Sequence, residues 1–352
     1  MPLLHFEQTG LLGLAAAVPA KAVDNRALGA ELGVPNIAEV IEKIGIEERR
    51  VASAEMCSSD LCAAAAERLL DDMSVDRAEI DLLVLVSQTP DFRMPATAVT
   101  LQHRLGLPST TMAFDLNLGC SGFVYGLSVI YGLMARPGIR HALLLNGETR
   151  TRAYSQKDKT TAFLFGDAGS AALIGRQREA GTSHFSLSSD GSRSDLLKIP
   201  AGGYRLPSSA DTVAERVVDD KGNIRSLEHG RMNGPDIFSF VIREVPRDVS
   251  LVMDRAGTAK DEIDYFVFHQ ANAYINGYLL KKLRLDASRV PSSLTSFGNT
   301  SSVSIPLTIV SQPCGGMTGT RRVLLSGFGA GLSWGTAVIT MRDCHISPLV
   351  EI

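Results

Sequence analysis

A single cysteine, Cys120, stands in the stretch NLGCSGFVYGL, between the apolar run MAFDL and a run whose apolar residues have helical spacing. At the start of such a helix, the sulfur would lie among unpaired backbone N–H groups at the positive end of the helix dipole, which favours the thiolate. The flanking Gly119 and Gly122 leave room for a substrate and permit a strained turn. A free cysteine is by default a small buried hydrophobe. The stretch therefore allows two interpretations, a core residue at a tight turn or an enzyme nucleophile.

Two polar residues in the second half are candidates to act with such a nucleophile. His269 follows the apolar run DYFVF and precedes QAN and a helical pattern. Ligands of open α/β sheets gather outside the carboxyl ends of strands, so this position favours function over the structural role that most lone histidines have. Asn299 lies in the glycine-containing turn of SFGNTSSVSIP, where an asparagine usually bonds its own backbone. On its own, Asn299 is interpreted as structural.

A glycine cluster, SGFGAGLSWG, follows the apolar run VLL near the end of the chain. Its glycines are compatible with an ordinary hairpin. They would also let backbone N–H groups approach a bound carbonyl closely. Both interpretations stay open from the residues alone.

The elements that must position these residues follow an α/β rhythm. In the first half we expect helices at 58–73, 97–107 and 121–135, and strands at 80–86, 112–116, 141–147 and 169–175. Ser58 or Ser59 is expected to cap the first helix, and Gly106 to end the second. Helices that alternate with buried strands in this way predict an α/β fold with helices on the sheet faces.

The second half repeats the first in letters. EIDLLVLVSQ, from Glu79, is echoed by EIDYFVFHQ from Glu262, and HALLLNG is echoed by RRVLLSG near Arg321, at a similar offset of about half the chain. This predicts a duplicated unit whose two copies pack together. We expect an N-terminal half at 1–180, a connecting segment at 181–235 and a C-terminal half at 236–352. The connecting segment is rich in Gly, Ser, Asp and Pro and is mostly a solvated connection, with a lid or tunnel wall as the alternative.

Bulk properties exclude several classes of protein. The chain has 352 residues, a formal net charge of -3 and no block of like charges, so we expect no nucleic-acid partner. Its five cysteines form an odd number without a CxxC pair, which indicates a reducing, cytoplasmic location. No apolar run approaches the ~20 residues that span a bilayer. No basic residue precedes the apolar N-terminal stretch, so we expect neither a secretory signal nor a membrane partner.

Four motifs taken together, GCSGF, FHQAN, GNTSSVSIP and GFGAGLSWG, resemble the β-ketoacyl-acyl carrier protein synthase III family of the thiolase-like superfamily. Their order and spacing fit the family from about Thr9 to near Met341. The resemblance favours Cys120 as a nucleophile. It implies two duplicated α/β halves in five layers, α-β-α-β-α, and a homodimer.

By this resemblance, Cys120 accepts the acyl group, and His269 and Asn299 handle the malonyl thioester. The backbone N–H groups of Cys120 and Ala330 would hold the tetrahedral oxyanion. The implied reaction is a decarboxylating Claisen condensation of an acyl primer with malonyl-acyl carrier protein. The implied substrates are thioesters of coenzyme A or acyl carrier protein, without a metal or redox cofactor.

Other positions match the family with an alternative beside each. Arg152 resembles an arginine that lies against the coenzyme A nucleotide, although a solvated surface charge looks the same. Lys281, Lys282 and Arg284 resemble a docking site for the acidic carrier protein, or an exposed helix face. Met94 resembles the residue that reaches into the partner subunit and caps the acyl pocket, or a core filler. Phe328, in GFGAG, is a further candidate to contact the substrate.

Two departures from the family pattern bear on the primer. Glu39 stands where relatives have a tryptophan that stacks on the coenzyme A adenine, and the only tryptophan is Trp334. Tyr274 takes the position of an arginine after HQAN. With the long 181–235 segment, they motivate the hypothesis that the primer differs from acetyl-coenzyme A.

Three competing functions stay open on the residues alone. The nearest is an acyltransferase of the same fold that moves the Cys120-bound acyl group to another acceptor. A non-catalytic partner subunit would be signalled by loss of a catalytic residue, and none of Cys120, His269 and Asn299 is lost. A cysteine protease is weaker still, because nothing resembles a protease signature.

Overall fold

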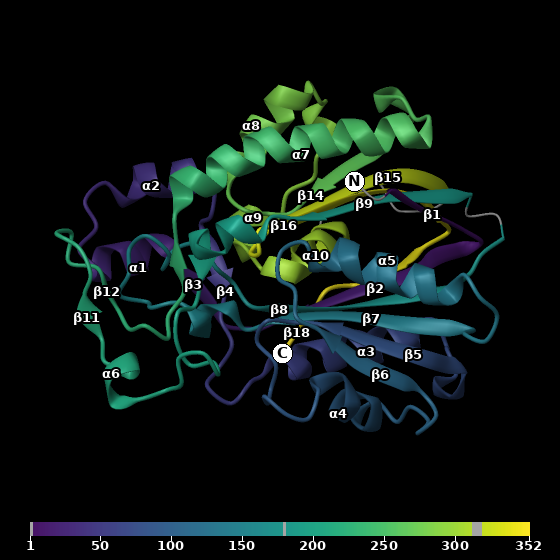
Figure 1. The fold of residues 1–352 in the computed structure, drawn as a ribbon, viewed down its shortest axis with the longest axis horizontal. Coiled ribbons are helices and arrows are strands. Elements are labelled where there is room, and N and C mark those ends of the chain that lie inside the picture. Colours follow the sequence, from purple (N-terminus) through teal and green to yellow (C-terminus); the bar gives the residue numbers. More distant parts are fainter. Residues whose placement is uncertain (1–2, 179–180, 312–318) are drawn as a thin grey trace.

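Two β-sheets organise the computed structural model, which describes residues 3–178, 181–311 and 319–352. The first sheet has the strand order β17-β2-β8-β7-β5-β6, with β18 also on β2, and the second has the order β1-β9-β16-β15-β14. Figure 1 shows the two sheets stacked, with helices outside each sheet and between them. The expected five layers, α-β-α-β-α, are therefore present.

The strands of the two sheets have the following bounds. The first sheet contains β2 (Thr9–Val18), β5 (Ile80–Val86), β6 (Met112–Leu116), β7 (His141–Glu148), β8 (Ala168–Arg176), β17 (His345–Ile346) and β18 (Val350–Glu351). The second contains β1 (Leu3–Glu7), β9 (Thr182–Ser189), β14 (Tyr265–Phe268), β15 (Thr320–Gly329) and β16 (Ser333–Arg342). The four strands expected in the first half coincide with β5, β6, β7 and β8.

Helices cover both outer faces and fill the space between the sheets (Figure 1). Outside the first sheet lie α3 (Ser58–Asp72) and α4 (Thr97–Arg104), and outside the second lie α7 (Gly234–Ala256) and α8 (Ala273–Leu283). Between the sheets lie α5 (Gly122–Met134) and α10 (Ser304–Ser311). Each apolar face is buried by these layers, and the cluster between the sheets includes Val84, Phe123, Leu144 and Leu325.

Shorter helices and strands complete the described fold. They are β3 (Ala22–Asp24), α1 (Asn25–Glu31), α2 (Ile37–Ile44), β4 (Glu48–Arg50), β10 (Leu197–Lys198), α6 (Ala210–Val213), β11 (Arg216–Val217), β12 (Ile224–Arg225), β13 (Arg231–Met232) and α9 (Leu294–Phe297).

The repeated letters correspond to repeated topology. In each sheet the strand at the repeated EID letters, β5 or β14, pairs in parallel with a longer strand, β7 or β15. That longer strand pairs antiparallel with the next one, β8 or β16. The two halves therefore share the same succession of a parallel and an antiparallel pairing.

Two expectations about the chain path were wrong. Residues 182–189, placed in the connecting segment, form β9 in the second sheet, where the strand pairs with both β1 and β16. The N-terminal β1 also belongs to this sheet, whereas the C-terminal β17 and β18 pair with β2 in the first. The N-terminal half thus contributes β1 to the second sheet, and the C-terminal half contributes β17 and β18 to the first. Short-range sequence patterns do not reveal these pairings.

The expected cap of the first helix was also wrong. Cys57, and not Ser58 or Ser59, is the N-cap of α3, and its backbone N–H donates to Asp60 Oδ2 at 2.7 Å. The Ser58 hydroxyl instead donates to the Thr89 carbonyl at 2.9 Å, because it faces the first sheet. The second expected helix ends as predicted, with Gly106 at φ 67° after α4.

None of the helices in the described ranges is long and apolar enough to cross a bilayer.

Candidate active site

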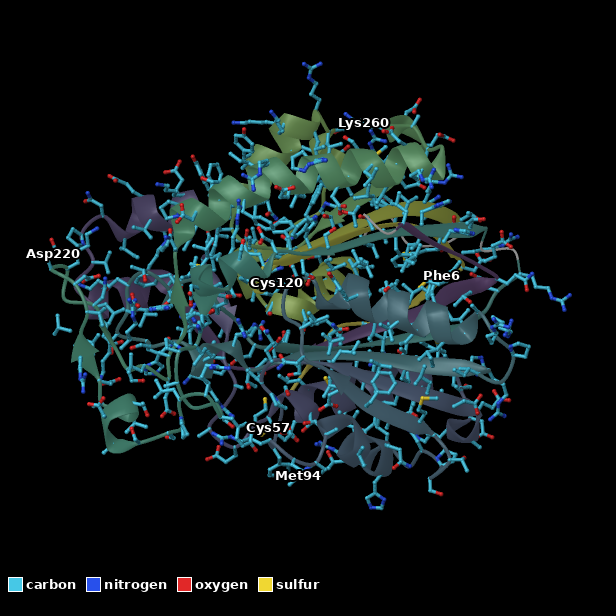
Figure 2. The ribbon with its side chains drawn as sticks, viewed as in Figure 1. Phe6, Cys57, Met94, Cys120, Asp220 and Lys260 are labelled. Atoms are coloured by element: carbon cyan, nitrogen blue, oxygen red, sulfur yellow. The ribbon has the colours of Figure 1, made fainter. Side chains whose placement is uncertain are left out.

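Cys120 lies at the centre of the molecule, in the loop between β6 and α5 (Figure 2). It is 5% exposed, and Ser121 is the N-cap of α5. The Ser121 hydroxyl is 2.7 Å from the Ser333 hydroxyl, which in turn donates to the Ala330 carbonyl at 2.8 Å. These bonds tie the start of α5 to the loop that carries Ala330.

Glycines in β15 allow this strand to lie directly over the nucleophile. A Cβ at Gly329 would be 2.7 Å from the Cβ of Cys120 and 2.8 Å from its sulfur. A Cβ at Gly327 would be 2.7 Å from the Cys120 carbonyl oxygen. These glycines therefore let β15 approach Cys120 itself, and the expected approach of their backbone N–H groups to a bound carbonyl stays a prediction.

The expectation that the surroundings of Cys120 favour the thiolate was wrong for the free protein. Burial raises the pKa of the Cys120 thiol, and the nearby Arg150 and Ser301 oppose this only in part. The Ser301 hydroxyl is 3.7 Å from the sulfur and donates to Glu148 Oε1 at 3.4 Å. Desolvation outweighs the helix N-terminus because the thiol is enclosed between the two sheets.

His269 follows β14 and is held as a neutral imidazole. It is 2% exposed, its Nδ1 is 2.8 Å from the Ser304 hydroxyl, and the Phe328 ring packs edge-on against it at 5.4 Å. Burial, with a smaller contribution from Arg150, lowers the pKa of His269 to about 3, although a backbone hydrogen bond with Ser301 opposes the shift. A neutral imidazole held on Nδ1 has Nε2 left for a substrate.

Asn299 makes the local backbone bond that its turn suggested and still faces the cavity. Its Oδ1 accepts the Ser301 N–H at 2.9 Å, which fixes the amide and leaves Nδ2 as the free donor. Nδ2 makes one long bond, 3.5 Å, to the Ala271 carbonyl. The structural and functional interpretations of Asn299 are therefore compatible.

The three predicted catalytic residues line one cavity. Cys120, His269 and Asn299 share a narrow space of about 50 Å³ with Arg150 and Phe328. Ala330 lines a neighbouring cavity that also reaches Arg150. A buried thiol, a neutral histidine and an oriented amide around one enclosed space suit acyl transfer to sulfur with donors to a second thioester.

Two family profiles match the chain. The profile described as "3-Oxoacyl-[acyl-carrier-protein (ACP)] synthase III" matches residues 114–191, and that of its C-terminal part matches residues 253–341. The beta-ketoacyl-[acyl-carrier-protein] synthase III of Clostridioides difficile (strain 630) is 33% identical over 94% of this chain and 98% of its own length. The chain belongs to the 3-oxoacyl-[acyl-carrier-protein] synthase III family. The predicted family is confirmed, and the protein is an acyltransferase.

Solved structures agree with this assignment. A 3-oxoacyl-(acyl-carrier protein) synthase from Burkholderia xenovorans LB400 aligns with a TM-score of 0.93 at 35% identity, over 100% of this chain and 99% of its own. The priming β-ketosynthase of the R1128 polyketide biosynthetic pathway aligns with a TM-score of 0.83 at 28% identity, over 96% of this chain and 97% of its own. The predicted thiolase-like fold is thereby confirmed.

Three residues of this synthase site were not singled out from the sequence. Glu148 and Arg150 follow the apolar letters of β7, and Ser301 lies two residues after Asn299. Burial raises the pKa of Glu148, although Arg150 and hydrogen bonds from Thr89, Gln88 and Ser301 oppose the shift. The available signal was the run of polar letters GETR at the carboxyl end of a buried strand, the same signal that pointed to His269.

The remaining predicted residues lie outside the catalytic cavity, apart from Phe328. Exposed Arg152 donates to the carbonyls of Ser53 and Met56, the latter at 2.6 Å. Met94 is 86% exposed and lies at the edge of the molecule (Figure 2). Lys281, Lys282 and Arg284 are exposed in the last turn of α8 and at its C-cap. Their proposed contacts with ligands stay predictions.

Among the described residues, no group of three or more His, Cys, Asp or Glu side chains could hold a metal ion. Cys314 lies outside the described residues.

Proposed function

We propose that this synthase condenses an acyl primer with malonyl-acyl carrier protein through an acyl-Cys120 intermediate. The observation that carries the proposal is the single cavity lined by Cys120, His269 and Asn299. All groups that the reaction needs come from the chain's own residues and the thioester substrates, so no resident cofactor enters the proposal.

In the first half-reaction the Cys120 sulfur attacks the primer thioester carbonyl. The backbone N–H groups of Cys120 and Ala330 stabilise the oxyanion, since the bonds from Ser121 and Ser333 hold both ends of this hole together. The carrier thiol leaves with the proton of the Cys120 thiol. Because the thiol pKa is raised by burial, deprotonation occurs within the substrate complex and not in the free enzyme.

In the second half-reaction malonyl-acyl carrier protein occupies the emptied side of the cavity. His269 Nε2 and Asn299 Nδ2 donate to its thioester oxygen as CO₂ leaves, which stabilises the enolate. A neutral histidine suits this step because it donates a hydrogen bond without a proton being transferred. The enolate carbon then attacks the acyl-Cys120 carbonyl, the sulfur leaves, and a 3-oxoacyl thioester two carbons longer is released.

A basic groove beside α8 supports docking of the acidic carrier. Lys282 of α8 and Arg243 and Arg247 of α7 line a surface groove together with Lys260. Lys281 and Arg284 extend this positive surface next to it. The groove adjoins the elements that follow His269, so a carrier bound there would present its thioester toward the catalytic cavity.

The proposed assembly is a homodimer. β6 lies at the edge of the first sheet, and its first residue, Met112, is 48% exposed. Met94 is exposed on the same side of the fold, ahead of α4. An open edge strand with exposed apolar side chains is a favourable surface for pairing with a second copy.

The proposed primer differs from acetyl-coenzyme A. Glu39, at the position of the family's adenine-stacking tryptophan, lines a surface cavity with Glu42 and Glu47. Tyr274 lies under Lys43 at 5.7 Å and beside Phe238, in place of an arginine that would meet a phosphate. These three carboxylates outnumber the one cationic side chain of the cavity, Arg26, and so disfavour a phosphorylated nucleotide.

The deciding experiment is the intact mass of malonyl-acyl carrier protein after incubation with the enzyme and a panel of acyl primers. We expect a product that carries the primer plus two carbons, with CO₂ released, and no product with Cys120→Ala. His269→Ala and Asn299→Ala are expected to form the acyl-enzyme and stop there. A carrier that stays malonylated while Cys120 is acylated would contradict condensation and favour transfer to another acceptor.

A further inference from the structure

The guanidinium of Arg150 is buried beside the nucleophile without an ion pair. The side chain is 5% exposed, and no carboxylate of a described residue forms a salt bridge with it. Its two hydrogen bonds are long, 3.3 Å to Gln88 Oε1 and 3.4 Å to the Tyr154 hydroxyl, and its buried Nε–H has no partner. A guanidinium has five N–H donors, so this group is under-satisfied.

Arg150 is held rigidly where it is. The Tyr154 and Phe165 rings stack 4.1 Å apart, and the guanidinium carbon lies 5.5 and 5.8 Å from their centroids. Cation–π contact stabilises the charge without using its N–H donors. Glu148 is near enough to interact with Arg150 through space, yet its own bonds are made to Gln88, Thr89 and Ser301.

The guanidinium forms the boundary between two cavities. On one side is the catalytic cavity, and on the other is a cavity of about 390 Å³. Most side chains that line this second cavity are polar: Gln88, Asn117, Arg150, Tyr154, Ser194 and Lys198. Ala330, whose N–H belongs to the proposed oxyanion hole, also lines it.

This second cavity offers the primer's acyl chain room that the catalytic cavity, of about 50 Å³, does not have. After acylation, the space beside His269 and Asn299 must be free for the malonyl group. The acyl tail on Cys120 therefore leads away from them, past Arg150. A purely alkyl tail there would cover a cation and several amides without replacing their hydrogen bonds, which is costly.

We propose that the primer is the monothioester of a short dicarboxylic acid, and that Arg150 binds its distal carboxylate. This inference rests on the proposed function and names its primer class. A carboxylate completes the unfilled donors of the guanidinium with charge-assisted hydrogen bonds and replaces the long bonds to Gln88 and Tyr154. Condensation would then give a 3-oxo dicarboxylic thioester on the carrier.

The test compares primers that differ only in charge. Pantetheine thioesters of glutaric acid and of its neutral 5-amide are incubated separately with the enzyme, without malonyl substrate, and acylation of Cys120 is followed by intact mass. We expect the acid to react about tenfold faster or more, as one charge-assisted contact would give. Pantetheine avoids any dependence on the nucleotide.

Variants identify Arg150 as the origin of the preference. Arg150→Leu is expected to remove the difference between the acid and amide rates, and Arg150→Lys to keep part of it. The ratio of the two rates is compared because loss of Arg150 also raises the pKa of the Cys120 thiol and slows both primers. Arg136→Leu, at the exposed end of α5, is the matched control and should change neither rate. Thermal melts report whether each variant is folded. The ratio of acid to amide rates in the wild-type enzyme tests the proposal even if a variant does not fold.

The outcomes separate this inference from the proposed function. Equal rates for acid and amide, followed by normal condensation of both, would overturn the dicarboxylic primer and leave the condensing function standing. An acid-to-amide rate ratio that Arg150→Leu leaves unchanged would contradict binding of the carboxylate by Arg150 and give this side chain a structural role only. If no thioester acylates Cys120, both proposals fail.

Discussion

At the scale of single residues, burial governs the chemistry of the site. His269 and Cys120 are both enclosed between the two sheets, and each is held in its neutral form. Both side chains are therefore uncharged near neutral pH in the free protein. Two predictions follow from this burial.

The first concerns acid stability. The pKa of His269 is about 3 in the folded protein, whereas an unfolded histidine has a pKa of about 6.5, so only the unfolded chain binds this proton between these values. This contribution to stability is therefore complete above pH 6.5 and is lost as the pH falls, by at most about 1.4 kcal/mol per pH unit.

The measurement is the free energy of unfolding from denaturant curves between pH 7 and pH 4.5, for wild type and His269→Gln. We expect wild type to lose stability relative to the variant as the pH falls. The exposed His103→Gln is the control and should follow wild type. Parallel curves for wild type and His269→Gln would contradict the burial argument.

The second prediction concerns the thiol. Burial raises the pKa of Cys120 while Arg150 lowers it in part, so the alkylation rate of Cys120 should titrate above the range of free cysteine. Arg150→Leu should move this titration higher still. Rates of iodoacetamide labelling at Cys120, read by peptide mass against pH, measure both. If the alkylation rate titrates at or below the pKa of free cysteine, the helix N-terminus stabilises the thiolate of Cys120 after all.

At the scale of elements, the contact of β15 with the loop before α5 fixes the position of Cys120, the proposed nucleophile. Gly329 is the point of contact, and a methyl group there would meet Cys120 atoms at 2.7 and 2.8 Å. Such overpacking shifts side chains and backbone at a cost of about 1–3 kcal/mol. A Gly→Ala substitution within a helix, at a position with open space around the added methyl group, instead stabilises the fold.

We therefore expect Gly329→Ala to slow acylation of Cys120 about tenfold or more and to lower the melting temperature, because the sulfur is displaced from the oxyanion hole. Gly277→Ala is the matched control: Gly277 lies in α8 with nothing within 4 Å of an added Cβ. It should leave acylation unchanged and stabilise the helix by about 0.5–1 kcal/mol. Equal effects of the two variants would show that the close contact between Gly329 and Cys120 does not position the sulfur.

At the scale of the whole molecule, the proposed docking of the acidic carrier rests on the uneven distribution of charge over the surface. The formal net charge is -3, yet Lys282, Arg243, Arg247 and Lys260 gather in one groove. Lys260 donates to the carbonyl of Leu283 at the end of α8, and Figure 2 shows it at the top of the view, away from Asp220 at the left end. Attraction between such a groove and an acidic protein speeds their association, and salt weakens it.

Reversal of this charge should weaken carrier binding alone. Lys281→Glu and Lys282→Glu are expected to raise the KM for malonyl-acyl carrier protein several-fold at low salt and to leave turnover of malonyl-pantetheine unchanged. Lys221→Glu, next to Asp220, is the control. Steady-state kinetics at two salt concentrations measure the effect. Equal losses with both malonyl donors would exclude a docking role.

The sequence by itself determined the element types, the thiolase-like fold and the three residues that share the catalytic cavity. It did so because each signal is local: a cysteine before a helical run, a histidine after a buried strand, and an asparagine in a turn directly after a glycine. Resemblance to the family then combined these local motifs, and Cys120, His269 and Asn299 indeed line one cavity.

Only the tertiary structure decided what surrounds those residues. Ser301 contacts Cys120 from 181 residues away in the sequence, and it contacts Glu148 from 153 residues away. The raised pKa of the Cys120 thiol and the unfilled donors of Arg150 therefore depend on contacts that no short sequence pattern encodes. The exchange of β1, β17 and β18 between the halves is non-local in the same way. Desolvation and hydrogen-bond satisfaction are properties of the assembled layers, and therefore the fold, not the motif, sets the charge states of the site.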